Sequence, residues 1–283
     1  ASTQIAYSFP LAEWTAAGGV KTFVHTVEQY FTALPIGMIL AGLIPAAIAG
    51  ALGSLILGLR GHYFAICTLG IGIAAGEFAT SMKIWGGGQG MTVPVWPKVD
   101  GQEIDILGGS VNFFYTLTFI LFFCTYFFLR WLFSTRFGLI LTAIRDNEDK
   151  AEAMGIPTMR YKVTGWVVSA FFMGIAGAIY GNINGYIEPT EVAFAGATVG
   201  VYMVLMAILG GKGTLWGPII GAIIFQVFKE FFWTYFLGWQ RVALGFLIVI
   251  IVVFFPEGIM GWLRRIKPEL FGEVVDRKAR LAQ

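Results

Sequence analysis

The chain has 283 residues, of which 57% are hydrophobic and 16% aromatic but only 13% charged, and its mean hydropathy is +0.74. This composition excludes a soluble globular domain, because most of the chain must have lipid as its solvent. The net charge of +2 is too small for a nucleic-acid-binding surface, so we expect no nucleic-acid partner.

The cysteines and histidines form no reactive or metal-binding pattern. Cys67 and Cys124 each lie inside an apolar run, where a small hydrophobic side chain is the ordinary interpretation. His25 and His62 have no Cys, Asp or Glu at ligand spacing. We therefore predict no disulfide, no metal site and no catalytic residue in this chain.

Residues 1–33 form the first predicted segment. Glu13, Lys21, His25 and Glu28 interrupt it too often for a membrane span, so we predict an amphipathic surface segment on the external side. Because the chain begins with Ala1 and not Met, we also expect the natural protein to start further upstream.

Apolar windows follow along the rest of the chain, long enough to cross about 30 Å of hydrocarbon as helices. They fall at residues 34–58, 62–82, 112–133, 163–186, 193–210, 215–236 and 241–263. We predict an all-α integral membrane protein whose helical bundle of about seven spans occupies residues 34–263. Gly70, Gly72, Gly76 and Glu77 make the second window weakly apolar, so a broken or re-entrant helix is an alternative there.

Lys and Arg residues gather in residues 134–162 and in the tail at 264–283. Cytoplasmic segments are enriched in Lys and Arg, so both stretches are predicted to be cytoplasmic. The number of predicted spans between them is even, which places both on the same side. The turn at Arg60 then lies inside, and the Gly-rich, acidic stretch 85–110 lies outside.

Glycines four residues apart recur in the predicted spans, at Gly72 and Gly76, Gly177 and Gly181, Gly181 and Gly185, Gly196 and Gly200, and Gly217 and Gly221. Small residues at this spacing let helix backbones approach closely in lipid. We interpret them as sites of tight packing. Alternatively, these glycines give smooth faces to helices that move during transport, but their spacing alone does not establish this.

The loop at residues 134–162 contains the start and stop signals of a short exposed helix of about two turns. Asp146 is the predicted N-cap, and Glu148 and Asp149 put acid in the first turn. Gly155 can end the helix in a left-handed conformation, and Pro157 blocks its continuation.

Ile144, Ala151 and Met154 give this helix a small apolar side, and Asp146 and Lys150 are spaced for an ion pair. A helix this short is marginal in water, because nucleation costs more free energy than a few hydrogen bonds return. Either it packs on the ends of its own spans, or it docks into a partner on the cytoplasmic face. The residues leave both alternatives open.

The run TRFGLILTAIRDNEDKAEAMGIPTMRYK resembles the cytoplasmic loop of LivM-type permeases, the membrane subunits of branched-chain amino acid ABC importers. Other segments match in the family's order: LRGHYFAICTLG from Leu59, GGGQGM from Gly86, SAFFMGIAGAIYG from Ser169, GYIEP from Gly185, ILGGKGTLWGPIIGA from Ile208 and FFPEGIMG from Phe254. The resemblance covers roughly residues 34–262.

The resemblance implies a type II ABC importer-like permease whose coupling helix, within residues 143–156, contacts an ATP-binding subunit. The implied contact residues are Arg136, Arg145, Asn147, Glu148 and Gly155. It implies a LivH-like second permease, two LivG/LivF-like ATPases and a periplasmic substrate-binding protein as partners, in the bacterial inner membrane. ATP and Mg²⁺ would bind to the ATPases, so no cofactor is expected in this chain.

By the same resemblance, the substrate is a branched-chain or other apolar amino acid, with urea and short amides as alternatives. Polar residues in spans often line transport pathways, and the candidates are Glu77, Asn182, Asn184, Thr198 and Tyr202. Ordinary solvation at the membrane interface explains Asn182 and Asn184 equally well. A secondary transporter or channel is a further alternative, and it would need Glu77 as its ion-coupling group.

Overall fold

The computed structural model describes residues 13–17, 20–24, 27–59, 62–82, 87–92, 109–194, 200–211 and 213–235. It also describes positions 96, 98–99, 102–103, 242, 245, 258–259 and 261. The chain divides into two compact units, one comprising Ala1–Phe128 with Ile140–Phe194 and the other Leu129–Leu139 with Ala195–Gln283. The described part is predominantly helical, which confirms the predicted helical membrane protein.

Three described helices are long and apolar enough to cross a membrane: α2 (Val27–Ile56), α4 (Ser110–Ser134) and α7 (Thr158–Asn184). They correspond to the predicted windows 34–58, 112–133 and 163–186. Helix α2 begins seven residues before its predicted start, so residues 27–33 belong to the helix and not to the N-terminal segment.

The early start of α2 has a tertiary cause. Tyr30 and Leu34 in the first turns of α2 are buried against Trp96, Phe114 of α4 and Ile179 of α7. The rings of Tyr30 and Trp96 meet edge to face, with their centroids 5.6 Å apart. Burying this aromatic surface stabilises helix beyond the apolar window that the sequence displays.

Helix α3 (His62–Ser81) matches the second predicted window. It runs without interruption through Gly70, Gly72 and Gly76, so the alternative of a broken helix is wrong. The hydroxyls of Thr80 and Ser81 each donate a hydrogen bond of 2.9 Å to the carbonyl of Glu77 near the end of this helix.

The last predicted windows are not confirmed as spans. Helix α8 (Val201–Gly210) has 10 residues, which is too short to cross the hydrocarbon alone, and α9 (Gly217–Tyr235) has 19. The window 241–263 lies almost entirely outside the described residues. Seven spans therefore stay a prediction.

Short strands accompany the helices. Strands β1 (Glu13–Ala17) and β2 (Val20–Val24) form an antiparallel hairpin where the sequence predicted an amphipathic surface segment. Strand β3 (Met91–Thr92) pairs with β6 (Tyr186–Ile187), and β4 (Lys98–Val99) with β5 (Gln102–Glu103). The short helical turns η2 (Gly87–Gln89) and η3 (Pro189–Ala193) flank the β3–β6 pair in sequence. Through that pair, the segment between α3 and α4 is joined to the end of α7.

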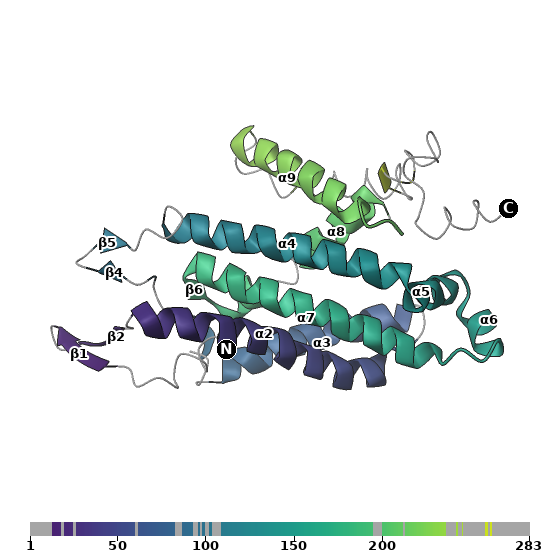
Figure 1. The fold of residues 1–283 in the computed structure, drawn as a ribbon, viewed down its shortest axis with the longest axis horizontal. Helices are drawn as coiled ribbons and strands as arrows, with labels where there is room; N and C mark the ends of the chain where they lie inside the picture. Colours follow the sequence, from purple (N-terminus) through teal and green to yellow (C-terminus); the bar gives the residue numbers. More distant parts are fainter. Residues whose placement is uncertain are drawn as a thin grey trace. The chain divides into compact units, whose positions relative to one another are not determined.

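Helices α2 and α7 lie side by side and antiparallel (Figure 1), and they approach closely at two glycines. A Cβ atom at Gly174 would lie 1.9 Å from the carbonyl oxygen of Ala41, and one at Gly42 would lie 2.7 Å from the Phe171 ring. The predicted pairs did not include either residue. Gly177, which did belong to a predicted pair, has no neighbouring atom within 4 Å of its Cβ position.

In the other unit, α8 and α9 pack through glycines that the sequence did predict. A Cβ at Gly221 would lie 1.9 Å from the carbonyl oxygen of Met206, and one at Gly217 would lie 2.2 Å from that of Gly211. Leu205, Leu209 and Phe225 form the buried cluster of this unit. The predicted tight packing is therefore confirmed at Gly217 and Gly221.

Candidate functional site

Two short helices connect α4 to α7, where the sequence predicted one. Helix α5 (Arg136–Asp146) is followed by α6 (Glu148–Ala153), and Asn147 separates them. The predicted N-cap, Asp146, is the last residue of α5. Asn147 is the N-cap: its backbone is extended, at φ −162° and ψ 107°, and its Oδ1 accepts a hydrogen bond of 2.9 Å from the amide of Lys150.

Asp146 pairs with Arg145 and not, as predicted, with Lys150. The guanidinium of Arg145 lies 3.1 Å from Oδ1 of Asp146. Because Asn147 changes the backbone direction between α5 and α6, Asp146 and Lys150 are not one turn apart on a single helix. The predicted ion pair depended on a spacing of four residues along one continuous helix, and the chain has no such helix from Asp146 to Lys150.

The C-terminal end of α6 confirms the predicted role of Gly155. Gly155 has φ +82°, its amide donates to the carbonyl of Glu152 at 2.8 Å, and the amide of Ile156 donates to Ala151 at 3.1 Å. This pair of hydrogen bonds is the Schellman motif, which satisfies the last carbonyls of a helix and favours Gly in the left-handed position. Pro157 then precedes α7 directly.

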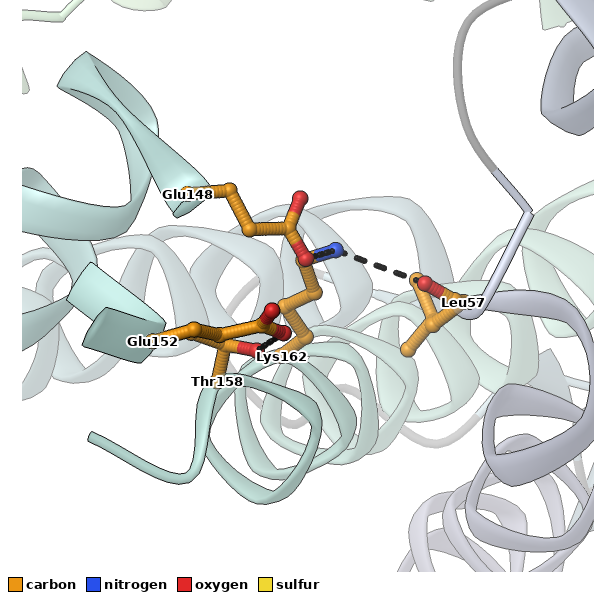
Figure 2. A network of polar contacts seen from close by, with 5 residues as sticks. All are labelled: Leu57, Glu148, Glu152, Thr158 and Lys162. Atoms are coloured by element: carbon orange, nitrogen blue, oxygen red, sulfur yellow. Dashed lines mark hydrogen bonds and ion pairs between the residues drawn. The ribbon is translucent and has the colours of Figure 1, made fainter. Parts of the chain in front are cut away.

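Polar side chains bind α6 to the beginning of α7 (Figure 2). The Nζ atom of Lys162 lies 2.5 Å from Oε1 of Glu148, and the hydroxyl of Thr158 donates to Oε1 of Glu152 at 2.7 Å. Lys162 Nζ also donates to the carbonyl of Leu57, just beyond the end of α2, at 3.4 Å. The loop is thus fastened to two membrane helices of its own unit.

The apolar side of the loop is divided between the interior and the surface. Ile144 and Ala151 are buried, and Thr158 is buried with them. Met154, which was predicted to share their side, is 70% exposed. Asn147, Asp149, Lys150 and Glu152 are also exposed. Helix α6 therefore packs on the ends of spans of its own chain, as the first alternative predicted, and Met154 directly after it is an exposed apolar side chain. Docking into a partner stays a prediction.

The predicted ATPase-contact residues lie in two kinds of position. Arg136, Arg145, Asn147 and Gly155 are exposed. Glu148 is turned toward Lys162, and the two side chains are only 26% and 20% exposed. The structure thus brings Glu148 into an internal network, and Arg136 is the first residue of α5.

Sequence reasoning missed the partners inside this network. Lys162 was predicted only to contribute positive charge to residues 134–162, and no role was predicted for Thr158 or Leu57. The separation of 14 residues between Glu148 and Lys162 carries no helical periodicity. One signal in the sequence could have indicated these contacts. Gly155 and Pro157 end α6 directly before a new helix begins, and such a tight turn places the start of α7 beside α6.

Four of the five predicted pathway residues are described, three of them in one unit and Tyr202 in the other. Glu77 is exposed on α3, and Asn184 is exposed at the end of α7. Asn182 donates from Nδ2 to the carbonyl of Ala178 at 2.8 Å, and its enclosed Oδ1 has no donor within the described part of the chain. Tyr202 lies in the other unit, with its ring centroid 5.2 Å from that of Phe225. Thr198 lies outside the described residues.

Metal-binding groups are also missing from the ranges described: no three His, Cys, Asp or Glu side chains there are placed to hold an ion. Cys67 is half-buried and Cys124 is exposed, and both are free thiols.

Long apolar helices, two of which are connected by the short helices α5 and α6, define a multi-pass helical membrane protein with a structured loop. The chain belongs to the family described as branched-chain amino acid transport system / permease component, whose model matches residues 11–254.

Curated relatives agree with this family. The chain is 29% identical over 270 residues to the high-affinity branched-chain amino acid transport system permease protein LivM of Escherichia coli (strain K12), covering 87% of this chain and 62% of the relative. It is 26% identical over 167 residues to the corresponding LivH of Salmonella typhimurium, covering 55% of this chain and 52% of LivH. The chain therefore spans about three fifths of the LivM length.

A third relative is the nucleoside ABC transporter permease protein NupC of Lactococcus lactis, 31% identical over 105 residues, or 36% of this chain and 32% of NupC. No solved structure matches the chain.

Proposed function

We propose that this chain is a transmembrane permease subunit of an ATP-driven ABC importer for branched-chain or other apolar amino acids. The observation that carries the proposal is the family match over residues 11–254, supported by the LivM relative. The chain itself would not be an enzyme, since ATP hydrolysis belongs to partner subunits, which bind ATP and Mg²⁺.

The proposed complex contains a LivH-like second permease, two LivG/LivF-like ATPases and a periplasmic substrate-binding protein. Similarity of this chain to both LivM and LivH supports pairing of two related permeases. We place residues 134–162 and the C-terminus on the cytoplasmic side of the bacterial inner membrane, because both are rich in Lys and Arg.

In this proposal, the exposed end of α6 docks into the ATPase. Met154 supplies an apolar contact, and Asp149, Lys150 and Arg145 supply charged groups around it. Apolar side chains at the centre of an interface with a polar rim are typical of protein docking sites. Closure of the ATPases around ATP would displace α6, and the spans would convert that displacement into alternating access.

A nucleoside is a second candidate substrate, because the NupC relative is described as a nucleoside permease. Urea and short amides are further candidates from the sequence resemblance alone. The described residues of the spans do not distinguish these solutes, so the test must compare them.

The test is reconstitution of the complex in proteoliposomes. The chain is coexpressed with candidate ATPases, a LivH-like permease and a binding protein, and uptake of labelled leucine, uridine and urea is measured with and without ATP. We expect copurification with the ATPases and ATP-dependent leucine uptake. Failure to copurify with any ATPase would reject the importer, and uptake without ATP would favour a secondary transporter or channel.

A further inference from the structure

We propose that Lys162 is a positioning residue that transmits displacement of α6 to the packed helix pair α2 and α7. The inference rests on the proposed function, because it requires that a partner moves α6. It adds the contact through which the movement reaches the membrane helices.

The first step is that α6 is held by a matched set of side chains. Glu148 and Glu152 lie four residues apart on α6, and Thr158 and Lys162 lie four residues apart on α7, so each pair occupies one helix face. The two contacts, Glu152 with Thr158 and Glu148 with Lys162, therefore form successive rungs between the helices (Figure 2). Rotation or translation of α6 must move α7 or break both rungs.

The second step is that Lys162 also contacts Leu57, the residue that follows α2. Its Nζ donates to the carbonyl of Leu57 as well as to Glu148. An ammonium group has three donors and can serve both acceptors at once. Leu57 follows the C-terminal end of α2, where unpaired carbonyls carry partial negative charge and favour a cation.

The third step is that α2 and α7 behave as a packed unit. Gly42 and Gly174 bring the two helices into close contact halfway along their length, and Tyr30 and Ile179 share a buried cluster near the opposite end. Closely packed helices transmit displacement with little compression. A force applied at Lys162 therefore moves both helices together.

The fourth step concerns charge. With side-chain exposures of 20% and 26%, Lys162 and Glu148 are mostly withdrawn from water. Removing the ammonium leaves a partly buried carboxylate without its partner, so α6 must reorient to solvate Glu148. Loss of Lys162 should loosen α6 from the helices without removing any residue from its exposed docking end.

The first experiment measures coupling in the reconstituted complex. Lys162→Met removes the charge and keeps most of the length, Lys162→Arg keeps a donor that can reach both acceptors, and Arg160→Met is the control at an exposed cation on α7. We expect Lys162→Met to keep ATPase association and basal hydrolysis but to lower solute uptake per ATP by roughly threefold to thirtyfold. Lys162→Arg should restore most of the uptake, and Arg160→Met should behave as the unsubstituted chain.

The second experiment uses the full permease chain without ATPases. Spin labels at Met154→Cys and Leu55→Cys, both exposed positions, report the distance between α6 and the end of α2 in a background that carries Cys67→Ala and Cys124→Ala. We expect Lys162→Met to broaden the distance distribution and Lys162→Arg to leave it narrow.

The outcomes separate the two proposals. Failure of the unsubstituted chain to bind ATPases would reject the proposed function. If Lys162→Met binds ATPases normally and its uptake per ATP is unchanged, the role of Lys162 is rejected and the proposed function stands. An unchanged distance distribution in Lys162→Met would also overturn the inference, because α6 would then be held without this contact.

Discussion

Gly174 of α7 lies directly against the backbone of Ala41 in α2, so close that a Cβ atom at position 174 would come 1.9 Å from the Ala41 carbonyl oxygen. A backbone carbonyl cannot turn aside as a flexible side chain can. The two helices must therefore separate to admit even a methyl group.

We expect Gly174→Ala to lower the free energy of unfolding by about 1–3 kcal/mol, measured by thermal denaturation of the purified chain in detergent or nanodiscs. Gly177→Ala is the matched control on the same helix, since its Cβ position has no atom within 4 Å. Ala is the better helix former, so the control should be neutral or slightly stabilising. Equal destabilisation by both substitutions would contradict the close approach.

Asn147 caps α6 with its side chain, and its loss should weaken that helix selectively. We expect Asn147→Ala to destabilise α6 by about 1 kcal/mol, because the amide of Lys150 loses its acceptor. The measurement is hydrogen exchange of the amides in residues 148–153. Asn147→Asp keeps an acceptor oxygen and should retain slow exchange; if both variants exchange alike, the cap is not what stabilises α6.

Gly155 occupies the left-handed conformation that closes α6. Gly155→Ala should cost about 1–2 kcal/mol, because a Cβ atom is disfavoured at φ +82°. Gly155→Asn is the control, since Asn tolerates this conformation better.

Combined with replacement of Glu148, Gly155→Ala should weaken ATPase association while membrane insertion stays intact. Copurification at the unsubstituted level would remove both residues from the docking mechanism.

Met154 tests the docking surface without disturbing the internal network. Its side chain is 70% exposed, so Met154→Ser removes little packing within the chain. We expect ATPase binding to weaken by about 1–2 kcal/mol, measured as a change in Kd, with the thermal stability of the permease unchanged. Met154→Leu should bind normally. Unaltered Kd in Met154→Ser would exclude Met154 from the interface.

Asn182 tests the proposed pathway. Its Oδ1 is enclosed without a donor among the described residues, and Leu has a similar volume without a polar group. We expect Asn182→Leu to lower solute uptake with little change in thermal stability, because loss of the hydrogen bond to the Ala178 carbonyl is offset by removal of the enclosed, unpaired acceptor. Unchanged uptake would exclude Asn182 from the pathway.

The sequence predicted most of what depends on local composition. The windows at 34–58, 112–133 and 163–186 were recognised because long apolar runs have few alternatives to a helix in lipid. Gly155 was assigned its left-handed conformation correctly, because Gly followed by Ile and Pro after a short helical run is a strong termination signal. Membership of the permease family was likewise readable from ordered motifs.

Other features depended on contacts between distant parts of the chain. The early start of α2 required Trp96 and Ile179, and the packing of Gly42 and Gly174 required a register between α2 and α7 that no spacing rule contains. Asp146 was predicted as the N-cap because it is an acid before a helical run. The backbone of Asn147 decided otherwise, since an independent α5 already included Asp146.

The loop at residues 134–162 shows where this division falls. Its charge, its helix-ending Gly155 and its resemblance to a permease loop are properties of adjacent residues, so the sequence by itself determined them. Whether Glu148 faces a partner or the interior was decided only by the fold. Lys162 and Leu57 are brought to α6 by the antiparallel packing of α2 and α7, and the cost of burying unpaired charge then turns Glu148 toward Lys162.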